Sequence, residues 1–178
     1  KQNMKINLIL GFGADRIRKT LEKQKNNQIK FLYNNDYENQ ESGGNFFIAL
    51  NNFNPKKESG LLLINNGILA NINWQRYLNK ISNNTIFFVS DKCYNFDLGF
   101  DDNGDYIFYD LPNTWVEILY LNKDTVQQLK NKDIPEIHNN MFMFEIINIL
   151  KEKYCNIDTF KLPANKIFKF NSTKDIQQ

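Results

Sequence analysis

The stretch INLILGFGADRIRKTLEKQKNNQIKFLY, residues 6–33, contains a strand, a helix and a second strand in direct succession. Ile6 to Leu10 is a short, partly β-branched apolar run, and Gly11-Phe12-Gly13 ends it. Residues 14–25 carry apolar side chains at helical spacing among basic residues, and Ile29 to Tyr33 is a second apolar run. A strand–helix–strand unit predicts two parallel strands joined by a right-handed crossover.

The same alternation continues through the first half of the chain. The spacing predicts a helix over 45–52, a strand over 61–64, a helix over 72–81 and a strand over 85–89. Leu61 to Ile64 and Thr85 to Val89 are apolar without alternation, which is typical of interior strands covered on both faces. We therefore expect an α/β fold of three layers, Rossmann-like, with a mixed, mainly parallel sheet between helices.

The second half of the chain has a different pattern. Residues 97–109 read as a β-hairpin around a Gly-containing turn, and an alternating strand follows over 115–121. The remaining expected elements are helices over 123–130 and 140–153 and strands over 157–162 and 167–170. No repeat or linker interrupts the order, so we expect one domain over residues 1–178.

Composition and charge narrow the class of protein. A chain of 178 residues with 42% hydrophobic and 14% aromatic residues can bury one real core. A formal charge of +2 from interspersed residues gives no field for a general nucleic-acid binder. No run approaches the about 18 apolar residues of a membrane span, and no signal peptide is visible, so we expect a cytoplasmic protein.

Metal and thiol chemistry have little support in the sequence. Cys93 and Cys155 are isolated, and His138 is the only histidine. Zinc sites and disulfide frameworks need closely spaced groups of such residues. We expect the cysteines to be small core residues, and His138 to lie at the surface or to cap a helix.

Several segments, in this order, resemble the nucleotidyltransferase family with the nucleotide-diphospho-sugar transferase fold, which joins a nucleotide to a sugar phosphate or to phosphocholine. The resemblance covers nearly the whole chain. The segments that carry it are Asn7–Gly13, Ile29–Glu38, Ser42–Asn45 with Ala49-Leu50, Leu61–Leu69 and Trp115–Leu121.

This resemblance implies a function and site residues. The nucleotide would come from a nucleoside triphosphate and the acceptor would be a phosphorylated small molecule, in the synthesis of capsule, surface-polysaccharide or lipid precursors. Glu117 lies where the family contacts the acceptor, with Asp91 and Lys92 as further polar groups. Asn45 lies in the loop and helix that face base and ribose, and Asn66 follows the third strand. A homo-oligomer or a partner subunit is compatible with this interpretation.

Departures from the family pattern concern the phosphates and the metal. The family begins with a strand and a glycine-rich loop that bind the triphosphate, and nothing in the sequence given resembles this segment before Lys1. We expect either that this sequence is a fragment of a longer chain or that the protein has lost the segment. The family's two metal-binding Asp residues fall on Gly67 and Asn171. The resemblance implies Mg²⁺, which prefers carboxylate ligands. Since neither position has a carboxylate, we expect no metal ligand in this chain.

Two other hypotheses remain open. The chain could be a catalytically inactive relative that serves as a binding or regulatory subunit, with Trp74, Tyr77 or Trp115 forming an exposed interface. It could also be a dinucleotide-binding Rossmann protein, because Gly11–Arg16 follows a strand and opens a helix and Asp36 lies about twenty residues further on. Arg16 replaces the third glycine of that fingerprint.

Overall fold

Strand β8 (Asn113–Asn122) is the centre of the main sheet. The structure is a computed structural model that describes residues 4–23, 29–65, 67–90, 96–101 and 103–170. One edge of β8 pairs with β5 (Asn84–Val89). The other edge is shared, because β6 (Leu98–Phe100) pairs with its start and β3 (Gly60–Ile64) with its second half. All three partners run antiparallel to β8.

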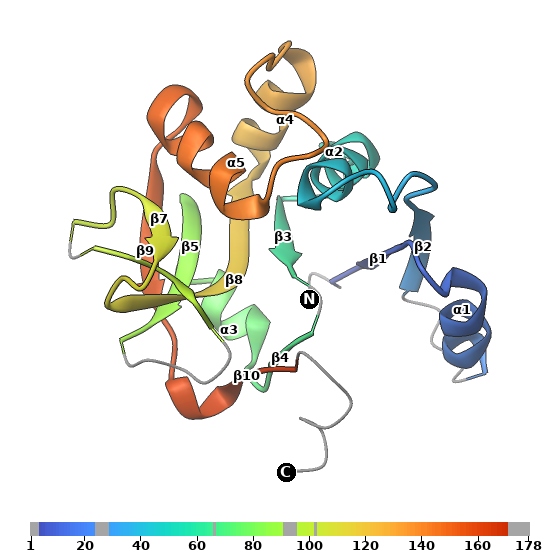
Figure 1. Ribbon diagram of the computed structural model, residues 1–178, viewed down its shortest axis with the longest axis horizontal. Coiled ribbons are helices and arrows are strands. Elements are labelled where there is room, and N and C mark those ends of the chain that lie inside the picture. The colour runs from blue at the N-terminus through green and yellow to red at the C-terminus, as the bar shows by residue number, and fades with distance from the viewer. Residues whose placement is uncertain (1–3, 24–28, 66, 91–95, 102, 171–178) are drawn as a thin grey trace.

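The remaining described strands extend this sheet or form separate pairs (Figure 1). β9 (Ile157–Lys161) continues the sheet parallel to β5, and β7 (Ile107–Tyr109) continues it antiparallel to β6. β1 (Ile6–Leu10) and β2 (Ile29–Tyr33) form a parallel pair of their own. β4 (Ile68–Ala70) pairs antiparallel with β10 (Ile167–Lys169).

Helices cover both faces of the main sheet. Figure 1 shows α4 and α5 along one side of β8 and α3 on the other. The bounds are α1 Ala14–Glu22, α2 Ser42–Asn52, α3 Trp74–Leu78, α4 Lys123–Asn131 and α5 Met143–Ile149, with a π-helical turn at Leu150–Tyr154 and a 3₁₀ turn at Ala164–Lys166. Asn73 and Asn122 cap α3 and α4, since each side chain accepts a backbone N–H of the first turn.

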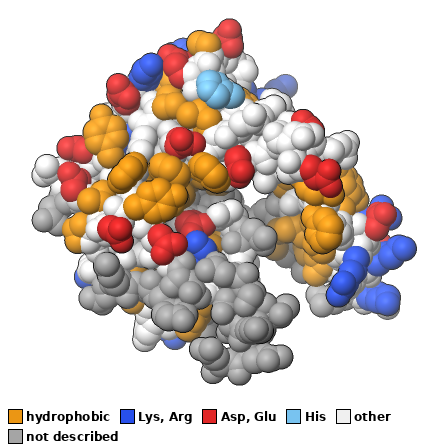
Figure 2. Space-filling view, viewed as in Figure 1, with side chains coloured by type: hydrophobic (Ala, Val, Ile, Leu, Met, Phe, Trp, Pro, Cys, Tyr) orange, Lys and Arg blue, Asp and Glu red, His pale blue; other side chains and the backbone are white. Residues whose placement is uncertain are grey.

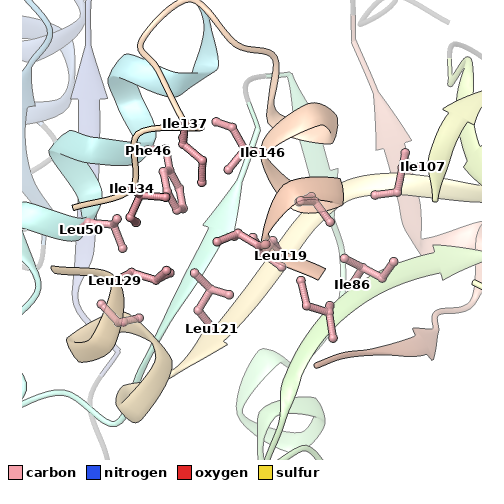
Figure 3. Close-up of a cluster of buried hydrophobic side chains, with 14 of the residues drawn as sticks. Phe46, Leu50, Ile86, Ile107, Leu119, Leu121, Leu129, Ile134, Ile137 and Ile146 are labelled. Atoms are coloured by element: carbon pink, nitrogen blue, oxygen red, sulfur yellow. The ribbon is translucent and has the colours of Figure 1, made fainter. Parts of the chain in front are cut away.

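Alternate residues of each central strand enter two different cores. On β8, Trp115, Leu119 and Leu121 pack into a larger core under α2, α4 and α5, ten residues of which are labelled in Figure 3. Val116 and Ile118 point the other way, into a smaller core with side chains of α3. Burial on both faces explains why these strands are apolar without interruption. The three-layer α/β class predicted from the sequence is confirmed.

Several elements match their prediction, and the differences have physical reasons. β1, α1 and β2 form the predicted parallel strand–helix–strand unit, and 97–109 contains the predicted hairpin. The main sheet is mixed as predicted, but it is not mainly parallel. Among its described pairs only β5–β9 is parallel, because β8 pairs antiparallel with β3, β5 and β6. The short strand β4 lies just before the helix predicted over 72–81, which is reduced to α3 because Asn71 and Asn73 favour turn and cap conformations.

Two predictions about exposure need correction. β5 is an interior strand as predicted, whereas β3 pairs only with β8 among the described strands. A continuous apolar run signals two buried faces and says nothing of the two edges. Trp74, Tyr77 and Trp115 are not an exposed interface, because Trp115 is fully buried and the other two pack against the smaller core.

Candidate functional site

Glu117 lies at a bulge in the middle of β8. Two steps along β5, from Phe88 to Ile86, correspond to four steps along β8, from Trp115 to Leu119. The extra residues are accommodated at Glu117, which has φ 57°. A side chain at positive φ is uncommon and strained, and a bulge of this kind redirects a side chain out of the regular pleat.

Hydrogen bonds from Asn65, the residue after β3, hold the bulge. Its backbone N–H donates to the Glu117 carbonyl at 3.1 Å, and its side-chain amide donates to the Glu117 carboxylate. The Trp115 indole N–H donates to the Ile118 carbonyl at 3.3 Å, on the next residue along. The strained backbone is therefore fixed from both sides, and the Glu117 carboxylate has a defined position.

Lys169 of β10 forms an ion pair with Glu117. The pairing of β10 with β4, which starts three residues after Asn65, brings these distant parts of the chain together. The two side chains are only 18% and 8% exposed, and the Lys169 ammonium also lies 5.3 Å from the centre of the Phe96 ring. Removing two charges from water is costly, so a buried ion pair is weak evidence for stability; at a pocket it marks a candidate site.

A half-open pocket of about 220 Å³ contains this ion pair. Its wall combines polar groups with aromatic rings, as ligand sites commonly do. The lining residues are Ser42, Asn65, Asp97, Leu98, Tyr109, Trp115, Glu117, Phe142, Met143, Phe144 and Lys169. In Figure 2 hydrophobic side chains gather over β7 and the start of α5, with carboxylates on several sides and a basic group nearby.

The structure brings only part of the predicted site together. Glu117 is in the pocket and is buried, so it is no ordinary exposed strand residue. Asn45 lies elsewhere on the exposed side of α2, where its carbonyl accepts a hydrogen bond from the Asn34 amide at 3.1 Å. Ser42 is the residue of that helix that lines the pocket. Asp91, Lys92 and Asn66 lie outside the described residues.

Gly67, the position that the resemblance aligns with a metal-binding Asp, is a tightly packed turn residue. Its φ is 78°, and a Cβ there would lie 2.5 Å from the Phe170 carbonyl oxygen. The Phe170 N–H donates to the Gly67 carbonyl at 2.8 Å, so two backbone segments meet here. Asn171, the second such position, is outside the described residues. Within the described ranges, no three His, Cys, Asp or Glu side chains are grouped to hold a metal.

Several pocket residues are not predicted from the sequence. Lys169 is the one charged residue in the strand Ile167–Lys169, and Asn65 directly follows an apolar strand; both patterns are weak signals of a site. The aromatic residues Tyr109, Phe142 and Phe144 give no signal, because they come from two elements that meet only in the fold. Their contribution depends on the packing of α5 against β7.

The architecture is that of the nucleotide-diphospho-sugar transferase-like fold, because solved nucleotidyltransferases match nearly the whole chain. HddC from Yersinia pseudotuberculosis matches it with a TM-score of 0.70 at 19% identity, over 97% of this chain and 76% of that chain. HddC complexed with GMP-PN matches with a TM-score of 0.66 at 18% identity, over 97% and 75%. CTP:phosphocholine cytidylyltransferase (LicC) from Streptococcus pneumoniae matches with a TM-score of 0.64 at 14% identity, over 97% and 75%.

Comparisons of the sequence alone add nothing to this assignment. No protein-family profile matches the chain, and no curated protein sequence does. In the part of the chain that the structure describes, no helix is long and apolar enough to cross a membrane.

Proposed function

We propose that this chain forms the acceptor-binding part of a nucleotidyltransferase, which transfers a nucleotide from a nucleoside triphosphate to a sugar phosphate or to phosphocholine. The observation that carries the proposal is the Glu117–Lys169 ion pair, fixed by the strained bulge of β8 at a pocket of this fold. A carboxylate can accept a hydrogen bond from a hydroxyl of a sugar phosphate, and an ammonium can bind the phosphate of either acceptor.

The proposal also covers the products of the reaction, its location in the cell, further contact residues and partners. Its products would be precursors of capsule, surface polysaccharide or lipid, made in the cytoplasm, where nucleoside triphosphates are available. Asp91, Lys92, Asn66 and Asn45 would contact the acceptor or the nucleotide. The protein would work with small-molecule substrates, as a homo-oligomer or beside a partner subunit, and without nucleic acid.

A catalytically inactive relative is the second candidate function. Mg²⁺ is the ion that such transfer normally uses, and it prefers carboxylate oxygens in near-octahedral geometry. The described residues do not fit it: Gly67 has no side chain and no room for one, and Glu117 is already paired with Lys169. We therefore derive no step through a metal. This misfit favours a domain that binds substrates without turnover.

We also propose that a further strand completes this single domain between β1 and β3. Among the described strands, β1 pairs only with β2 and β3 only with β8, and Figure 1 shows β1 and β3 facing each other from the two sheets. The sequence of β3, Gly-Leu-Leu-Leu-Ile, has none of the charges or prolines that protect a free edge. Such an edge is suited to pairing, and a glycine-rich loop after the added strand would supply phosphate-binding N–H groups.

Titration of the 178-residue chain with phosphocholine, common sugar 1-phosphates and nucleoside triphosphates tests the function. We expect a phosphorylated acceptor to bind, and Glu117→Gln to weaken it by about tenfold or more, since a charged hydrogen bond contributes about 1.5–3 kcal/mol. Glu152→Gln is the control, because Glu152 is an exposed carboxylate of the π-helical turn and does not line the pocket. Lack of binding by every phosphorylated acceptor would contradict the proposal.

Release of pyrophosphate, measured with and without Mg²⁺, separates the two candidate functions. We expect no release by this chain, because the described residues provide neither a metal site nor a phosphate loop. Turnover above background would favour the enzyme, with metal ligands outside the described residues. Acceptor binding without turnover would favour the inactive relative.

A further inference from the structure

A row of aromatic rings extends over the surface from β7 to the start of α5. Phe108 meets Tyr109 edge to face with ring centroids 5.7 Å apart, and the Tyr109 ring meets Phe144 in the same way at 6.0 Å. Phe142 stacks on Phe144. Phe108, Tyr109 and Phe142 are 59%, 51% and 49% exposed, and Tyr106 is also an exposed ring. We call these five residues the aromatic face; exposed apolar groups of this size commonly mark an interface.

Carboxylates surround the aromatic face. Asp97, Asp105 and Asp110 are exposed, and residues 96–112 contain five Asp and neither Lys nor Arg. Of the three exposed Asp residues, only Asp105 is in an ion pair with a residue that the structure describes, at 4.0 Å from Lys151. Figure 2 shows these features together, with carboxylates on several sides of the hydrophobic group. The aromatic face is therefore acidic as well as apolar.

The backbone edge of β7 is closed at Ile107, so a partner would contact side chains there. The Ile107 N–H donates to the Asn148 side-chain carbonyl at 2.8 Å, and the Asn148 amide donates back to the Ile107 carbonyl at 3.0 Å. An edge satisfied in this way does not accept a further strand at that residue. The exposed rings and carboxylates are what remains for recognition.

Helix α1, in another part of the molecule, presents the opposite charge. Arg16, Lys19 and Lys23 are exposed, and their spacing places them on one side of the helix. Arg18 interacts with the two acidic residues of α1, at 3.7 and 3.8 Å, whereas the other three have no ion pair within the described ranges. Phe12, just before the helix, is 82% exposed. We call Phe12, Arg16, Lys19 and Lys23 the basic face.

Charge excludes several occupants of the aromatic face. Nucleic acid and anionic lipid would be repelled by the carboxylates. Two aromatic faces packed against each other would bring like charges together, which is unfavourable. An apolar protein surface would bury the carboxylates without a counter-charge. A basic surface with an apolar residue fits, because Arg and Lys pair with carboxylates and also bind to the faces of aromatic rings.

We propose that the aromatic face of one molecule binds the basic face of a second copy of this chain. Figure 1 shows α1 and β7 at opposite ends of the molecule, so the two faces of one copy cannot meet each other. Contacts between two different faces repeat from copy to copy, and they form a closed ring or an open chain of molecules. This contact needs no substrate, so it does not depend on the proposed acceptor role.

Sedimentation velocity of the 178-residue chain without ligands tests the association itself. We expect the mean mass to rise with protein concentration at about 0.1 M NaCl and to fall when the salt is raised to about 1 M, because screening weakens contacts between exposed charges. Association through apolar groups alone would not weaken with salt. A monomer at every concentration, or assemblies that high salt leaves unchanged, would overturn the proposal without the use of any variant.

Charge reversal on α1 tests the basic face. Arg16→Glu/Lys19→Glu should weaken self-association about tenfold or more, since charged residues commonly dominate such contacts. Lys56→Glu/Lys57→Glu is the matched control, because it changes the net charge equally at two exposed residues outside both faces. Both variants should unfold cooperatively on heating. Equal weakening by the two variants would mean that total charge, and not the basic face, drives the association.

A mixture of two variants tests whether the two faces bind each other. Phe108→Ser/Asp110→Asn removes a ring and a charge from the aromatic face and keeps α1 intact. Asn is chosen because residue 110 has φ 58°, which Asn tolerates. We expect this variant and Arg16→Glu/Lys19→Glu each to be monomeric alone. Mixed, they should form a one-to-one dimer and nothing larger, because one intact pair of faces remains. Absence of that dimer would contradict the pairing.

Discussion

Glu117 is the pocket residue whose backbone and side chain are most restricted. Its positive φ and the burial of its charge each cost free energy, and the ion pair with Lys169 offsets part of that cost; together they hold one carboxylate in one place. Gly67 shows the opposite situation: its lack of a side chain is what lets two backbone segments meet. Substitutions at these residues therefore test packing and charge separately.

Lys169→Met should destabilise the protein by about 3 kcal/mol, because it leaves the Glu117 charge buried without its partner. The double variant Glu117→Gln/Lys169→Met should recover part of this loss, since no uncompensated charge remains. Urea unfolding of both, with exposed Lys166→Met as the control, measures the difference. A double variant less stable than Lys169→Met would contradict this account of the pair.

Gly67→Ala should destabilise more than Gly13→Ala. Both glycines have positive φ, at 78° and 68°, so both substitutions cost about 1 kcal/mol of backbone strain. Only at Gly67 would the new Cβ also meet a backbone atom, whereas nothing lies within 4 Å at Gly13. Thermal unfolding should show the larger loss for Gly67→Ala, and Gly67→Asp should gain no Mg²⁺ affinity. Equal losses would mean that the Phe170 segment moves away freely.

Cys155 should react slowly with alkylating reagents in the folded protein. Burial disfavours the thiolate and raises the pKa of the Cys155 thiol to about 11. Only the thiolate reacts as a nucleophile. The alkylation rate of Cys155 at pH 8 should therefore be about a hundredfold below that of a free thiol, and it should rise with pH beyond 9. In a Cys93→Ser variant Cys155 is the only thiol, so iodoacetamide labelling of that variant measures the reaction rate of Cys155 alone. Fast labelling at pH 8 under native conditions would contradict the burial.

Among the elements, α2 depends on a distant loop for its start. No side chain caps its first turn. Instead the Gly43 N–H donates to the Met141 carbonyl at 2.9 Å, and the Gly44 N–H donates to the Asn139 carbonyl at 3.2 Å. Backbone carbonyls thus satisfy donors that a Ser or Asp cap normally satisfies. The same contact positions Ser42 and the start of α5 at the pocket.

Gly43→Ala should destabilise this contact by about 2 kcal/mol, as overpacking commonly does. A Cβ on Gly43 would lie 2.2 Å from the His138 carbonyl oxygen, so the loop and the helix would have to separate. Asn51→Ala on the exposed face of the same helix is the control and should be nearly neutral. Unfolding in urea gives both values. A neutral Gly43→Ala would show that the loop does not fix the helix.

At the scale of the whole molecule, the described strands form the main sheet and two separate pairs, β1–β2 and β4–β10. The main sheet and the β1–β2 pair each present an edge without a described partner strand, on β3 and on β1. The rest of the fold is closed around β8, whose two faces are covered by the two cores. Exposed edges of this kind open locally at low cost, whereas an interior strand opens only with the whole domain.

Hydrogen exchange should reveal these edges. Amides of β5, which lies between β8 and β9, should be the most protected, and alternate amides of β1 and β3 should exchange rapidly. A longer polypeptide that carries the proposed strand should protect β1 and β3 as strongly as β5. Uniform protection of β3 in the 178-residue chain would mean that its edge is already paired, and the proposed strand would be unnecessary.

The sequence by itself determined the class of fold and most of the elements, because these depend on local patterns. Apolar runs, helical spacing and Gly-containing turns predict β1, α1, β2, β5 and the 97–109 hairpin from neighbouring residues alone. The order of these elements also predicts Glu117 as a site residue, through the family resemblance. The alternation of strands and helices could not predict that β8 is antiparallel to its neighbours, because the relative direction of strands depends on pairing between distant segments.

Only the tertiary structure decided what surrounds Glu117. Asn65, Lys169 and the rings of Tyr109 and Phe144 lie far apart in the chain, and they meet because β3, β10, β7 and α5 converge on the bulge of β8. The bulge itself leaves no pattern in the residues, since it arises from the register with β5. Asn45 does not line the pocket, whereas Ser42 of the same helix does. Helical periodicity identifies the faces of a helix, and only packing decides which of them is turned toward the site.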